Sequence, residues 1–152
     1  MVAPAAVPLD GRGLTLFTVL AGTDQGSPPN RADVVRLEGT SLLVLARSLQ
    51  NAMVYRQAST VLYTPQNVAP LNQLVLTTVV HQANGNVSIR VDGQERELGL
   101  ISIDATQTMN VELGSRDFRG EIAALLVYSR ALDLPDVENV EAYLQSVWNC
   151  CN

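Results

Sequence analysis

Two glycine-containing turns, separated by one short run, limit how this 152-residue chain folds more than any other feature. Asn84-Gly85 and Asp92-Gly93 are the pairs that two-residue type I′ hairpins prefer, because both central positions need positive φ. Two successive hairpins make an antiparallel meander of three strands. In its central strand, residues 86–91, the core-facing side chains are expected to be Val87, Ile89 and Val91.

The rest of the chain up to residue 129 alternates short β-rich runs with turn signals, the pattern typical of a β-sandwich. The expected strands are residues 14–20, 33–38, 41–47, 52–56, 60–63, 73–82, 109–113 and 119–129. The last run is apolar on both faces, so a further element is expected to cover its outer side.

A capped amphipathic helix is predicted to supply that cover over residues 134–148. Asp133 suits an N-cap, and Pro135 is tolerated in the first turn of a helix. The expected apolar stripe is Val137, Val140, Leu144 and Val147, with Tyr143 and Trp148 beside it. We expect this stripe to pack against the outer face of the closing strand.

The closing strand and helix, residues 119–148, resemble the corresponding segment of concanavalin A-like, laminin G-like jelly-roll domains. The turn Val91-Asp92-Gly93 also resembles one in that family. Two positions differ, since members often carry an aromatic at the position of Arg90 and a Trp near Leu74. The resemblance implies an all-β, antiparallel jelly-roll β-sandwich with one C-terminal α-helix, and it implies a binding or structural module rather than an enzyme.

The domain organisation is expected to be simple. Residues 1–12 read as an extended N-terminal arm without a secretory signal, residues 13–149 as one sandwich domain, and residues 150–152 as a frayed C-terminus. The family's early strands have little room ahead of residue 14, so one sheet edge is expected to be open to a partner, such as a neighbour's arm. The partner-binding residues of the arm are then expected to be Met1, Val2, Pro4, Val7, Pro8 and Leu9.

Charge and hydropathy argue against two classes of partner. The chain carries 15 acidic and 10 basic side chains, and the basic ones are scattered, so no nucleic-acid surface is predicted. No apolar run approaches the roughly 20 residues that span a bilayer, so no membrane partner is expected.

Catalysis has one candidate pair, Glu95 and Glu97. At period-two spacing in a strand these carboxylates would share a face, compatible with the separation of about 5 Å in a retaining glycosidase. Position 99 is Gly rather than a third acid, and Glu95 directly follows a turn, where charged residues usually serve solvation. No enzymatic activity is therefore predicted.

No cofactor is predicted, although calcium remains open. The oxygen-bearing turn residues are Asp24, Asn30, Asp33, Asp104 and Asp117, whose ordinary role is turn formation. Cys150 and Cys151 are expected to be reduced thiols, with an intermolecular bridge as the alternative, and they lack the spacing of a zinc site. His81 alternates with Val80 on a strand and is expected at the surface.

A glycan site would need exposed rings, and the candidates are Tyr55, Tyr63 and Phe118. Three scattered rings do not by themselves indicate a stacking platform. The leading functional prediction is therefore a non-enzymatic decoration or cement protein of a bacteriophage particle, located in the virion. It would form homo-oligomers and bind capsid or tail subunits through its arm and sheet edge. The alternative is a free-standing, extracellular, lectin-like domain that binds carbohydrate, with its calcium dependence left open.

Overall fold

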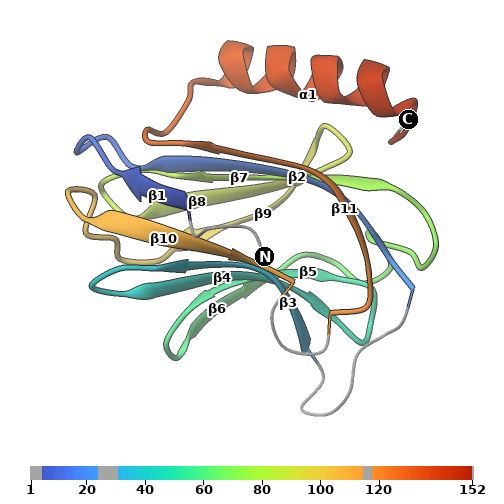
Figure 1. Ribbon diagram of the computed structural model, residues 1–152, viewed down its shortest axis with the longest axis horizontal. Coiled ribbons are helices and arrows are strands. Elements are labelled where there is room, and N and C mark those ends of the chain that lie inside the picture. Colours follow the sequence, from blue (N-terminus) through green and yellow to red (C-terminus); the bar gives the residue numbers. More distant parts are fainter. Residues whose placement is uncertain (1–4, 24–30, 115–117, 152) are drawn as a thin grey trace.

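The computed structural model describes residues 5–23, 31–114 and 118–151 as two antiparallel sheets packed face to face, with one helix on the outside (Figure 1). The six-stranded sheet runs, in spatial order, β1 (Ala5–Pro8), β10 (Thr108–Leu113), β3 (Arg31–Glu38), β4 (Leu42–Ser48), β5 (Met53–Gln57) and β6 (Thr60–Tyr63). The five-stranded sheet runs β11 (Gly120–Tyr128), β2 (Leu14–Gly22), β7 (Val75–His81), β8 (Asn86–Val91) and β9 (Gln94–Leu100). The predicted jelly-roll β-sandwich is confirmed.

The main core lies between the sheets and is built from alternate residues of each strand. In β4, Leu43 and Leu45 face this core, while Val44 and Ala46 face the opposite side of the sheet. In β8 the core residues are Val87, Ile89 and Val91, as the meander predicted. Every strand range expected from the sequence overlaps an observed strand.

The two glycine turns are not alike. Asp92 and Gly93 both have positive φ, of 51° and 77°, as a type I′ turn requires. At the other hairpin Gly85 has a φ of 92°, whereas Asn84 is absent from the positive-φ residues. Gly85 N–H donates to the carbonyl of Gln82, so the loop spans three residues rather than two. A turn of this kind needs one glycine only, which is why the dipeptide rule failed there.

The edge that was expected to be open is covered by the chain itself. Residues 5–8, which the sequence analysis assigned to an arm, form β1 and pair antiparallel with β10. Val7 packs against the core, and Leu9, just beyond the strand, is buried. Leu9 N–H also donates to the carbonyl of Gln107 at 2.9 Å. The edge strand of this sheet is therefore β1 rather than β10.

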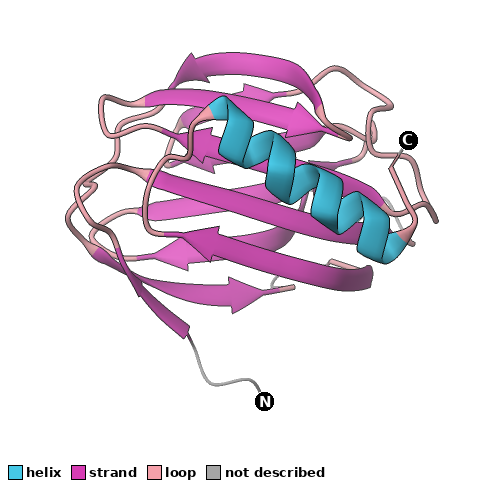
Figure 2. Cartoon of the chain, turned by 90° about the horizontal axis from the view of Figure 1, so that it is seen from above, coloured by secondary structure: helices cyan, strands magenta, loops and turns pink. Residues whose placement is uncertain are grey.

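Helix α1 (Leu134–Trp148) crosses the outer face of the five-stranded sheet (Figure 2). Its predicted N-cap is confirmed, since the side chain of Asp133 accepts the N–H of Asp136 at 3.1 Å. No helix among the described residues is long and apolar enough to span a bilayer.

The face that α1 buries differs from the predicted stripe. The buried residues are Val137, Glu141 and Leu144, and Val147 is 52% exposed. The buried face of α1 therefore includes a carboxylate, that of Glu141, which the predicted apolar stripe did not contain. The reason is Arg90 of β8 on the sheet below it, whose Nε lies 2.9 Å from a carboxylate oxygen of Glu141.

His81 lies in the interior and not at the surface, which corrects the sequence prediction. Its side chain is fully buried, with Nδ1 3.0 Å from the hydroxyl of Tyr55 and Nε2 2.7 Å from the carbonyl of Ile101. Burial lowers the pKa of His81 and raises that of Tyr55. The pair joins the two sheets, because His81 belongs to β7 and Tyr55 to β5.

Candidate functional site

The outer face of the six-stranded sheet, on the side away from α1, carries the candidate site. The strand registers place Arg36 of β3 and Arg56 of β5 directly on either side of Val44 of β4. The two arginine Cα atoms are thus two strand spacings apart, or about 10 Å. On the far side of Arg36, in the same row, lies Glu112 of β10. We call this surface the arginine face.

Small apolar side chains make the floor of the arginine face. Val44, Ala46 and Val54 are fully buried although they point away from the main core. Leu42 and Val61 pack against them at the sides.

The two guanidinium groups are held loosely. Arg36 lies 3.4 Å from a carboxylate oxygen of Glu112, and Arg56 lies 3.7 Å from one of Asp33. Both distances exceed the roughly 2.7–2.9 Å of a good charge-assisted hydrogen bond. The Nε atoms of Arg36 and Arg56 are buried and have no hydrogen-bond partner among the described residues. Such a donor costs about 1–3 kcal/mol while it lacks an acceptor.

Tyr63 supplies an aromatic ring at the margin of this face. It pairs with Val54 across β5 and β6, so the two side chains share a face of the sheet. Its side chain is 46% exposed, as the sequence analysis predicted. The other two ring predictions fail: Tyr55 is 1% exposed because it faces the core, and Phe118 packs against that core.

The chemistry available on the arginine face is mixed. It presents two partly exposed guanidinium groups with their carboxylate partners, Asp33 and Glu112, and a phenol ring, all over a buried apolar layer. Donors that lack acceptors suit a ligand rich in oxygen, and guanidinium forks suit one that carries a carboxylate. The arrangement is suited to binding.

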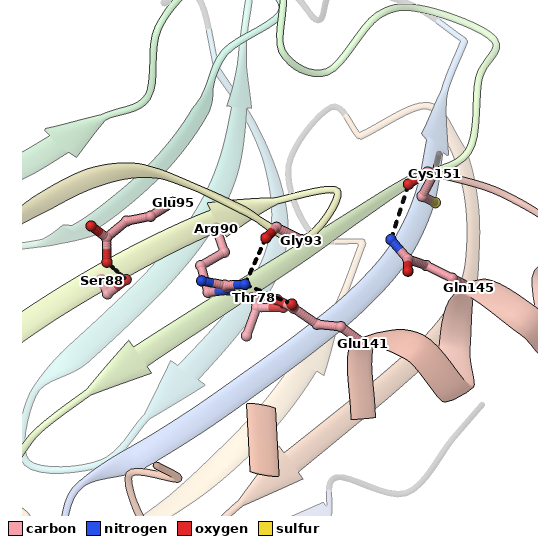
Figure 3. Close-up of polar contacts among 8 residues, drawn as sticks. All are labelled: Thr78, Ser88, Arg90, Gly93, Glu95, Glu141, Gln145 and Cys151. Carbon is pink, nitrogen blue, oxygen red and sulfur yellow. Dashed lines mark hydrogen bonds and ion pairs between the residues drawn. The ribbon is translucent and has the colours of Figure 1, made fainter. Parts of the chain in front are cut away.

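A second surface lies on the five-stranded sheet, on β8 and β9 beside α1. A groove of about 540 Å³ is lined by Val80, Gln82, Asn86, Val87, Ser88, Glu95, Leu98, Gly99 and Leu100. Leu98 and Leu100 are 61% and 67% exposed on the edge strand β9. In Figure 3 the ion pair of Arg90 and Glu141 lies between this region and the helix.

The two carboxylates considered for catalysis do not share a face. A register shift in β9 sets Glu95 opposite Arg90 and Glu97 opposite Ile89. Arg90 faces α1 and Ile89 faces the core, so the irregularity separates the two side chains. Glu95 accepts a hydrogen bond from Ser88 instead, at 3.1 Å (Figure 3). The prediction that Glu95 and Glu97 share a face of the strand is therefore wrong.

The calcium candidates are not gathered into a site in the part of the chain that the structure describes, where no group of three or more His, Cys, Asp or Glu residues is placed to hold a metal ion. Asp33 is buried beside Arg56, and Asp104 accepts hydrogen bonds from Thr106. Asp24, Asn30 and Asp117 lie outside the described residues.

The cysteines differ from the expectation of free thiols, since Cys150 and Cys151 are joined by a disulfide. The segment is also tied down rather than frayed. Cys150 N–H donates to the carbonyl of Gln145, whose side-chain amide donates to the carbonyl of Cys151 (Figure 3). Both cysteines pack against the cluster under α1.

The expected partner-binding residues are divided by the structure. Met1, Val2 and Pro4 lie outside the described residues, and Pro8 is exposed in β1. The side chains of Val7 and Leu9 are engaged with the chain's own core. Contact of the remaining residues with another subunit stays a prediction.

Known structures support the fold, whereas sequence comparisons give nothing. No family model matches the sequence, and no curated protein matches it either. A heptameric SAP-like pentraxin from Limulus polyphemus has a TM-score of 0.65 at 15% identity, over 93% of this chain and 73% of that one. The CBM40 of the Ruminococcus gnavus IT-sialidase, bound to alpha2,3 sialyllactose, has a TM-score of 0.65 at 12% identity, over 86% of this chain and 83% of that one.

A larger protein shares the same architecture. Trypanosoma rangeli sialidase has a TM-score of 0.67 at 13% identity, and the match covers 99% of this chain but 27% of the sialidase. The chain thus spans about a quarter of that enzyme's length. All three likenesses concern the β-sandwich fold.

The sequence analysis missed the arginine face. Its signal is present, because Arg36 lies between the core-facing Val35 and Leu37, and Arg56 follows the core-facing Tyr55. Alternation assigns each to the outer face of its strand. That β3 and β5 both pair with β4 is known only from the order of the strands in the sheet. Alternation along a single strand does not predict that order.

Proposed function

We propose that this chain is a non-enzymatic glycan-binding module that holds an acidic sugar on the arginine face. The observation that carries the proposal is the row formed by Arg36 and Arg56, whose side chains stay 23% and 21% exposed and whose ion pairs, at 3.4 and 3.7 Å, are longer than a good charge-assisted hydrogen bond. Sugar hydroxyls and a carboxylate would accept hydrogen bonds from the terminal guanidinium nitrogens, and Tyr63 would pack against the sugar ring. The likeness to a CBM40 bound to alpha2,3 sialyllactose supports this choice of ligand class.

The proposal is tested by binding measurements with alpha2,3-sialyllactose. We expect Arg36→Gln, which removes the fork, and Arg56→Lys, which keeps the charge beside Asp33, each to weaken binding about tenfold or more, or about 1.4 kcal/mol. Arg96→Gln is the matched control, because Arg96 is exposed on the other sheet. An equal loss in the control, or no binding by the wild type at millimolar sugar, contradicts the proposal.

The second candidate is a decoration or cement subunit of a phage particle, located in the virion. The observation that favours it is the exposure of Leu98 and Leu100 on the edge strand β9, where apolar side chains invite another chain. Its partners would be capsid or tail subunits or further copies of the chain. Immunogold labelling of purified particles tests this role, and label found only on material outside the particles opposes it.

A further inference from the structure

Glu112 lies where a ligand's acid group would approach Arg36. The two residues are directly opposite across β10 and β3, and their charged atoms are 3.4 Å apart. The Glu112 side chain is 56% exposed, whereas that of Arg36 is 23% exposed. The side chain of Arg36 is thus mostly buried, whereas the carboxylate of Glu112 is largely exposed to water.

The other ion pair of the arginine face is different in kind. The side chain of Asp33, beside Arg56, is 5% exposed, so this carboxylate is a fixed part of the site. A long ion pair whose carboxylate is exposed, such as Arg36–Glu112, contributes only about 0–1 kcal/mol, because water competes for the carboxylate. Of the two carboxylates, Glu112 is therefore the one that a ligand can displace at little cost.

We propose that Glu112 acts as a built-in competitor, occupying the anion position of Arg36 until the carboxylate of an acidic sugar takes its place. This inference rests on the proposed function of the arginine face. On binding, Glu112 turns into solvent and the sugar carboxylate accepts from the guanidinium. The exchange keeps charge balanced at Arg36 and favours acidic over neutral sugars, since a hydroxyl cannot replace a carboxylate there.

Substitution of Glu112 then has the opposite effect from an ordinary contact residue. Glu112→Gln is expected to tighten binding of alpha2,3-sialyllactose about two- to fivefold, the range that corresponds to an exposed ion pair. Lactose, which has no carboxylate, is expected to show no such gain.

Glu38 gives a matched control. It faces the same side of β3 as Arg36, two residues along, is exposed, and makes no ion pair with a described residue. Glu38→Gln removes the same charge from the same surface, so it reports the general electrostatic effect of a less acidic face. The effect assigned to Glu112 is the gain beyond that of Glu38→Gln.

The deciding experiment is titration calorimetry of wild type, Glu112→Gln and Glu38→Gln with sialyllactose and lactose, at low and high salt. A gain confined to Glu112→Gln and to sialyllactose, and reduced by salt, supports the inference. Equal gains in both variants, or weaker binding by Glu112→Gln, overturn it and leave the glycan proposal standing. Absence of sialyllactose binding by all three proteins overturns both.

Discussion

The guanidinium of Arg90 and the carboxylate of Glu141 form a buried ion pair that fastens α1 to the five-stranded sheet. Nε of Arg90 lies 2.9 Å from one carboxylate oxygen and its terminal nitrogen 3.0 Å from the other. Thr78 donates its hydroxyl to the same carboxylate at 2.8 Å (Figure 3). The hydrogen bond to Glu141 raises the pKa of Arg90. Both side chains are at least nine-tenths buried, so each depends on the other for neutralisation.

Replacing Glu141 is therefore expected to destabilise the protein strongly. Glu141→Leu leaves a buried arginine without its counter-ion, which costs about 3–5 kcal/mol of unfolding free energy. The double variant Arg90→Met, Glu141→Leu is expected to recover most of that loss. Urea unfolding measures both, with Glu138→Leu, an exposed position on the same helix, as control. A loss no greater than that of Glu138→Leu would show that the pair contributes nothing.

Arg90 and Glu141 also mark the limit of what the sequence predicts. Alternation and turn residues located the strands, and the cap of Asp133 located the helix. The partner of Arg90 lies 51 positions away, so no local pattern connects them. Counting only apolar residues then gave a helical stripe that ends on the exposed Val147.

The candidate site was missed for a related reason. Arg36 and Arg56 become neighbours of the same residue, Val44, only through the pairing of β3, β4 and β5. The register shift in β9 likewise depends on its pairing with β8. It places the side chains of Glu95 and Glu97 on opposite faces of the strand. Alternation along a strand predicts which face of the sheet a side chain lies on. The register between strands determines which side chains it contacts.

The stability of the protein is expected to fall as the solution is acidified below about pH 6.5. Burial lowers the pKa of His81 in the folded state, so the unfolded chain binds a proton first. Stability from this group is complete above the unfolded pKa and is lost as the pH falls toward the folded pKa. The steepest slope is about 1.4 kcal/mol per pH unit.

Urea unfolding between pH 7.5 and pH 5.5 checks this dependence. His81 is the only histidine of the chain, so other side chains titrate little in that window. His81→Gln is expected to be less stable at every pH but to show a flat profile. A slope that persists in this variant would assign the effect to another group.

Leu9 is expected to hold the first strand against the sheet. Its side chain is 7% exposed and belongs to the main core, so Leu9→Ala should lower the unfolding free energy by about 2–4 kcal/mol. Pro8→Ala, one residue earlier and exposed, is expected to cost much less. Hydrogen exchange at β10 reports the docking of β1. Equal protection of Met109 in Leu9→Ala and wild type would mean that β1 stays paired without this anchor.

Substitution of Tyr63 distinguishes an effect on sugar binding at the arginine face from an effect on protein stability. Because nearly half of its side chain is exposed, Tyr63→Ala is expected to cost less stability than a core substitution, while it removes the ring that a sugar would pack against. The expected loss of affinity for sialyllactose is about three- to tenfold, from an aromatic contact of roughly 0.5–1.5 kcal/mol.

Tyr143→Ala is the matched control, since that ring is 63% exposed on α1, over the other sheet. An equal loss in both variants would indicate a nonspecific effect of removing exposed rings. A loss in Tyr63→Ala alone, together with the losses in Arg36→Gln and Arg56→Lys, requires one ligand to contact β3, β5 and β6 at once, and only the outer face of the six-stranded sheet brings those three strands together.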